Sequence, residues 1–148
     1  MLVGMTSKFA HMIYFSVLLL PILTLAREAT LYDRLGGAKG VDALSSAFIY
    51  QLSHDARLGK NAGVMEIKKQ VPELEAKRRL SLALNHATGG PAKSNRAALM
   101  KGISADVDLG AREWFYVIQD ANQTMDERKI GAKERKDLLT LLLRAKDQ

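Results

Sequence analysis

The chain contains no cysteine, only three prolines and only three histidines among its 148 residues. Without cysteine it has no disulfide, no lipid anchor on a leader cysteine and no thiolate for catalysis or metal binding. Aromatic residues make up 6% of the chain and do not alternate with basic residues, as a surface that binds single-stranded nucleic acid requires. No Ser-His-Asp set, phosphate-binding loop or zinc-ligand spacing is recognisable. The sequence therefore predicts neither an enzyme nor a nucleic-acid-binding protein.

The start of the chain has the layout of a secretory signal peptide. Residues 1–11 hold one cation, Lys8, and no acid, while residues 12–25 are almost wholly apolar. Small residues then lead to Ala26, directly before the first charged residue of the remaining chain, which predicts cleavage after Ala26. The alternative is an uncleaved anchor, but the apolar run is shorter than the roughly 20 residues of a spanning helix. We therefore expect one periplasmic or secreted domain over residues 27–148, with residues 1–26 removed.

The formal net charge is +6, and the leader contributes only Lys8, so residues 27–148 carry +5. Basic residues are spread along the sequence with acidic residues between them. This pattern favours an ordinary solvated surface, and attraction of an anionic ligand or an acidic partner is the alternative.

Apolar residues recur at helical spacing through most of the mature chain, and no segment has the period of a strand. A Thr30-x-x-Asp33 capping pattern starts a short helix, and the Gly36-Gly37 pair ends it. Asp108 is a candidate cap for a later helix. The sequence predicts an all-α fold packed as a small layered bundle. The longer helices are expected over residues 38–53, 73–87, 110–127 and 132–146, with shorter ones near 31–35, 64–70 and 95–101.

The order of these segments resembles the truncated globins, the short two-over-two globins, and group 1 in particular. The opening Leu31-Tyr-Asp-Arg-Leu-Gly-Gly37, Phe48 near the end of the second helix, Ala87-Thr-Gly-Gly-Pro91, Met100 and Trp114 follow the family's order. The similarity runs from Thr30 to about Leu143. It implies a two-over-two helical fold, a haem, and a diatomic ligand such as oxygen or nitric oxide.

The residues that would hold the haem depart from the family pattern. Counting forward from Met100 or back from Trp114, the family's proximal histidine falls at Ser104, and a serine hydroxyl is no strong ligand for haem iron. Ile49 follows Phe48, where the family commonly has a tyrosine. The resemblance thus gives five candidate pocket residues, of which His86 or Met100 would be the substitute iron ligand: Phe48, Ile49, His86, Met100 and Ser104.

Two functions remain open at this point. The first is an exported haem protein in which His86 or Met100 replaces the missing histidine. The second is a globin fold without iron chemistry, which binds a protein or a small ligand. His86 otherwise fits a polar residue near a helix end, Met100 fits a gap-filling core residue, and His54 fits a surface or capping residue. In both cases we expect no nucleic-acid partner and, after leader cleavage, no membrane partner.

Overall fold

A computed structural model describes residues 28–91 and 109–147. Within these two ranges the regular structure is helical and contains no strand, which confirms the all-α prediction. The predicted leader, the expected helix at 95–101 and two of the candidate pocket residues lie outside the described residues. The helices are α1 (Leu31–Arg34), α2 (Gly37–His54), the short 3-10 helix η1 (Leu58–Lys60), α3 (Ala62–Gln70), α4 (Glu73–Ala87), α6 (Ala111–Glu127) and α7 (Ala132–Lys146).

Local signals place most helix ends. The predicted bounds of α4 and α7 agree with the structure, and those of α2 and α6 agree to within one residue. The capping box of α1 is present, because the Thr30 side chain accepts from Asp33 N–H and the Asp33 carboxylate accepts from Thr30 N–H. Helix α3 begins two residues earlier than expected because the Asn61 side chain caps it. The expected cap at Asp108 is wrong, since Gly110 is the N-cap of α6.

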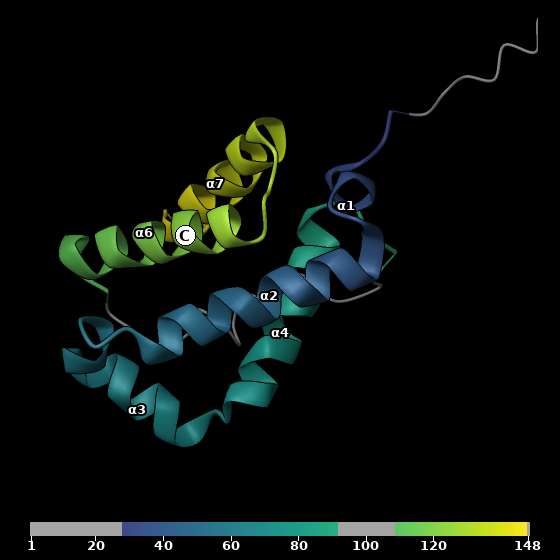
Figure 1. Cartoon of the computed structure of the whole chain (residues 1–148). Coiled ribbons are helices and arrows are strands. Elements are labelled where there is room, and N and C mark those ends of the chain that lie inside the picture. The colour runs from purple at the N-terminus through teal and green to yellow at the C-terminus, as the bar shows by residue number, and fades with distance from the viewer. Residues whose placement is uncertain (1–27, 92–108, 148) are drawn as a thin grey trace, which may run out of the picture.

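Helix α2 is the centre of the described structure (Figure 1). It packs against both α4 and α6, while α7 packs on α6 and also contacts α1. The buried core joins three of these helices through Leu44 of α2, Met125 of α6 and Leu138 of α7. The predicted apolar stripe of α2 is confirmed, because Val41 is fully buried and Leu44 is 5% exposed. None of the described helices combines the length and apolar composition that a membrane span requires.

The second Gly-Gly pair closes α4 against α1. Tyr32 N–H donates to the Thr88 carbonyl at 2.9 Å, and Gly90 N–H donates to the Asn85 carbonyl at 2.8 Å. Gly89 has a φ of 89°, the left-handed conformation that commonly ends a helix. A Cβ atom at Gly90 would lie 2.1 Å from Asn85 Oδ1 and 2.7 Å from the Tyr32 ring. Only glycine therefore fits at this contact without a shift of its neighbours.

Arg34 ties α1 to the other end of the sequence. Its Nε lies 3.0 Å from Glu134 Oε1, and its Nη2 also pairs with Asp137, both on α7. Because α1 also contacts the end of α4, this short helix connects the first half of the bundle to the last helix.

Candidate functional site

Three of the predicted pocket residues, Phe48, Ile49 and His86, lie among the residues that the structure describes. Phe48 is partly buried and packs against the core cluster around Leu44 and Met125. Ile49 is the next residue of α2 and is partly buried, and His86 is partly buried near the end of α4. Met100 and Ser104 lie outside the described residues. Phe48 is therefore a core contact, and no described contact brings it together with His86.

Neither His54 nor His86 lies with the core-facing side chains. Leu84 lies on the side of α4 that packs against the core. His86 follows two residues later and therefore lies about 200° further round the helix. His54 is exposed at the end of α2, where its ring stacks on Tyr50 with the centroids 4.1 Å apart. Its Nδ1 lies 2.9 Å from the Tyr50 carbonyl oxygen. The described residues contain no group of three His, Asp or Glu side chains that could hold a metal ion.

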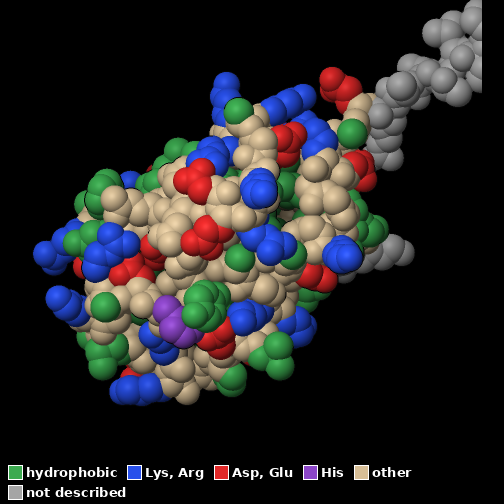
Figure 2. All heavy atoms as spheres, viewed as in Figure 1, with side chains coloured by type: hydrophobic (Ala, Val, Ile, Leu, Met, Phe, Trp, Pro, Cys, Tyr) green, Lys and Arg blue, Asp and Glu red, His purple; other side chains and the backbone are tan. Residues whose placement is uncertain are grey.

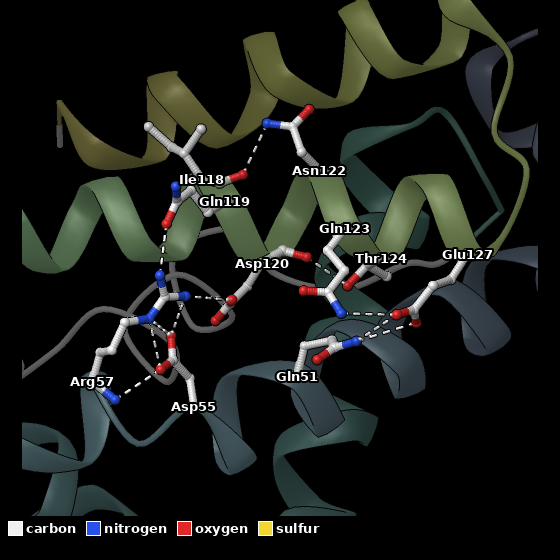
Figure 3. A network of polar contacts seen from close by, with 10 residues as sticks. All are labelled: Gln51, Asp55, Arg57, Ile118, Gln119, Asp120, Asn122, Gln123, Thr124 and Glu127. Atoms are coloured by element: carbon white, nitrogen blue, oxygen red, sulfur yellow. Dashed lines mark hydrogen bonds and ion pairs between the residues drawn. The ribbon is translucent and has the colours of Figure 1, made fainter.

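A network of polar contacts joins the end of α2 to α6 (Figure 3). We use the name polar junction for Arg57 and the four residues that its side chain contacts: Asp55, Tyr116, Gln119 and Asp120. Arg57 lies at its centre and donates from Nε to both carboxylate oxygens of Asp55 at 3.0 Å. Its Nη1 donates to Gln119 Oε1 at 2.7 Å and its Nη2 to Asp120 Oδ1 at 3.3 Å. The guanidinium carbon lies 4.5 Å from the centroid of the Tyr116 ring, a cation–π distance.

Residues close together in the sequence position Asp55 and Arg57 of the polar junction. Asp55 is the C-cap residue of α2, and its carboxylate accepts from Arg57 N–H at 2.7 Å. This contact turns the chain toward η1 and aims the Arg57 side chain at α6. Asp55 and Arg57 are two positions apart in the sequence, but nothing local indicates their partner on α6. Asp120 lies 63 positions after Arg57, so only the packing of α6 on α2 brings them together.

The two carboxyl groups of the polar junction have opposite pKa shifts. Asp120 is 4% exposed, and this burial, reinforced by the neighbouring Asp55, raises its pKa to about 6 against the opposing effect of Arg57. The pKa of Asp55 is lowered, chiefly by its hydrogen bond with Arg57. Asp120 Oδ2 is buried and accepts no hydrogen bond from the described residues. Asp55 and Arg57 therefore form the ion pair, while the raised pKa of about 6 lets the Asp120 carboxyl hold a proton below that pH.

Burial limits what the polar junction can do chemically. The side chains of Asp55 and Asp120 are 8% and 5% exposed, so a substrate does not reach either carboxyl group in this arrangement. In this geometry the polar junction connects the end of α2 with α6.

A second polar group, at the start of α4, does not form a hydrolase site. Ser53 Oγ lies 3.2 Å from His54 Nδ1 and 3.2 Å from Glu73 Oε2. A catalytic triad needs the histidine between the nucleophile and the acid. Here the serine lies between the other two, and Nδ1 also faces a backbone carbonyl.

A shallow hollow beside α1 is lined by Thr30, Tyr32 and Asp33 together with residues 89–91, and the capping box occupies part of it. Figure 2 shows a face on which basic and acidic side chains are interspersed, with hydrophobic side chains scattered among them.

No protein-family model matches this chain, and no curated protein matches it. What the protein does is therefore inferred from its own residues and from the way they pack.

Proposed function

We propose that the protein is an exported binding module with a truncated-globin-like fold and without histidine-ligated iron. The observation that carries this proposal is the position of the two mature histidines. His54 stacks on Tyr50 at the surface, and His86 lies away from the side of α4 that faces the core. Together with Ser104 at the family's proximal position, this leaves iron without an imidazole ligand from the described residues.

The packing of the helices supports the fold part of this proposal. A two-over-two globin needs two helix pairs stacked on one another. In this chain α2 packs on α4 and α6 packs on α7, while the contact between α2 and α6 joins the two pairs. The core residue Leu44 lies where these pairs meet, in contact with side chains of α6 and α7.

The described residues do not fit a haem as the family holds it. Phe48, which would contact the macrocycle, is packed against the Leu44 and Met125 cluster instead. The Ile49 side chain has no group that could donate a hydrogen bond to a bound ligand. We therefore assign no chemical step to iron in this protein.

The second candidate function is a haem protein with a substitute ligand, His86 or Met100, that binds a diatomic gas. One observation favours it. His86 is partly buried on α4, the helix that ends at the Gly-Gly-Pro turn and so corresponds to the family's distal helix. Apolar burial contributes to haem affinity, so a lost ligand does not remove all binding.

A haemin titration followed by visible spectroscopy separates the two candidates. For the purified protein we expect a broad Soret band, like that of non-specifically bound haem. We expect the band to be unchanged in the His86→Ala and Met100→Leu variants. A sharp Soret band that disappears in either variant would establish the second candidate.

The mass of the protein recovered from the producing cell tests export, with Arg27 expected as the new N-terminus.

A further inference from the structure

Most of the net positive charge of this protein lies in its last helix and the turn before it. Residues 128–146 contain seven Lys and Arg and only two Asp and Glu, so this segment carries +5 of the total +6. The other residues of the chain are nearly balanced. The net charge therefore lies mainly in this segment, although most of the 22 Lys and Arg lie elsewhere in the chain among acidic residues.

The acidic residues of this region are turned toward the rest of the protein. Glu134 and Asp137, the two acids of residues 128–146, both pair with Arg34 of α1. Asp126, just before this segment, pairs with Arg135. The contacts with Arg34 hold two negative charges on the α1 side of α7, while the Asp126–Arg135 pair neutralises one of the seven cations.

The outer side of α7 presents the cations to solvent. Lys133, Lys136 and Arg144 recur at helical spacing on the side opposite the buried Leu138, and all three are exposed. Their side chains have no ion pair or hydrogen bond to the described part of the chain. Helix α7 packs on α6 and α1, and the buried Leu138 lies on its packed side. We call these three residues the basic stripe; the exposed Arg128 and Lys129 of the preceding turn extend it.

We propose that the basic stripe binds the surface of a bilayer that contains anionic phospholipid headgroups. The outermost cations of the stripe lie about 16 Å apart at 1.5 Å per residue, and exposed lysines are attracted to negatively charged membrane surfaces without needing a shaped pocket. Leu143, 46% exposed beside Arg144, adds an apolar contact at the same surface.

Other anionic partners fit the basic stripe less well. Residues 128–146 contain no aromatic side chain, so bases of a single-stranded nucleic acid have nothing to stack on. Protein interfaces are enriched in aromatic residues and depleted in lysine at their centres, which is the reverse of this surface. The proposal replaces the sequence-based expectation of no membrane partner, because the structure gathers the cations on one side of α7. It is independent of whether haem binds.

Vesicle co-sedimentation of the full chain, as recovered from the producing cell, tests the proposal. Binding to phosphatidylglycerol vesicles is compared with binding to phosphatidylcholine vesicles, so that any contribution of the apolar leader is common to both. We expect the protein to bind more strongly to the anionic vesicles than to the phosphatidylcholine vesicles. Binding to the anionic vesicles should weaken with added salt. The Lys133→Gln/Lys136→Gln variant should bind them about 30-fold more weakly, the loss expected for two cations at a headgroup surface.

The matched control is Lys39→Gln/Lys60→Gln, which removes the same charge from two exposed lysines of α2 and η1. This variant should keep most of the affinity, and circular dichroism should show that both variants fold. Equal binding to the two kinds of vesicle would overturn the proposal, as would an equal loss in the two variants. Tighter binding to a duplex oligonucleotide than to anionic vesicles would overturn it in favour of a nucleic-acid partner.

Discussion

Replacing Asp120 by asparagine should remove a pH-dependent loss of stability from this protein. Asp120 is 4% exposed, and burial raises its pKa from the ordinary 3.8 to about 6. Between these two values the folded protein holds a proton that the unfolded chain has already released. Raising the pH through this window removes that proton, so the free energy of unfolding falls as the pH rises. Asparagine stays neutral and should show no such fall.

The size of the effect follows from the shift. Moving a carboxyl pKa from 3.8 to about 6 corresponds to about 3 kcal/mol. The pKa of Asp55 is lowered, but Asp55 is present in both proteins, so its contribution to stability cancels in the comparison. We expect Asp120→Asn to gain about 2 kcal/mol relative to the wild-type protein when the pH goes from about 4 to about 8. The amide can still accept from Arg57 and can donate to Asp55.

Urea unfolding curves at a series of pH values measure this difference. The matched control is Asp126→Asn, since Asp126 lies on the same helix but is exposed and pairs at the surface with Arg135. That variant should change stability by less than about 1 kcal/mol, with no transition near pH 6.

One result would refute the reasoning. If Asp120 were a carboxylate held by Arg57 in a buried ion pair, Asp120→Asn would destabilise the protein by about 3 kcal/mol or more at neutral pH. The stability of the wild-type protein would then stay constant through pH 6 and fall only below about pH 4, where the unfolded carboxyl is protonated, which is the reverse of the predicted slope.

Three further variants test the fold, each by its denaturant midpoint. Gly90→Ala should cost about 1–3 kcal/mol because its Cβ would lie 2.1 Å from Asn85 Oδ1; no loss would show that this turn is loosely packed. Lys129→Gly should add about 1 kcal/mol because Lys129 has a φ of 54° at the end of α6, and a loss would contradict that geometry. Met125→Ala should cost about 2–5 kcal/mol because Met125 is 3% exposed in the core, and a smaller effect would place it outside the core.

The parts of the fold that the sequence predicts well depend on neighbouring residues. Pro72 and the glycines after Ala87 bound α4, and a capping pattern starts α1, so both helices could be placed from short segments. The cap of α6 is predicted wrongly because the sequence favours a side-chain cap at Asp108, whereas Gly110 begins the helix without one.

The candidate site is harder to predict because it depends on contacts between distant segments. The Asp55-x-Arg step is visible in the sequence, but nothing local shows that Asp120 meets it. Similarly, Phe48 is a plausible pocket residue in the sequence, and only the packing of α6 and α7 on α2 makes it a core residue. Spacing in one helix does not show which neighbour covers each side.

The haemin spectrum of Ser104→His, recorded beside that of the wild-type protein, tests most directly whether a globin-type fold has lost its iron ligand. The account predicts a broad Soret band for the wild-type protein and a sharp, histidine-ligated band for the variant. A sharp band in both proteins would contradict the loss of ligation. A broad band in both would contradict the globin-type placement of Ser104.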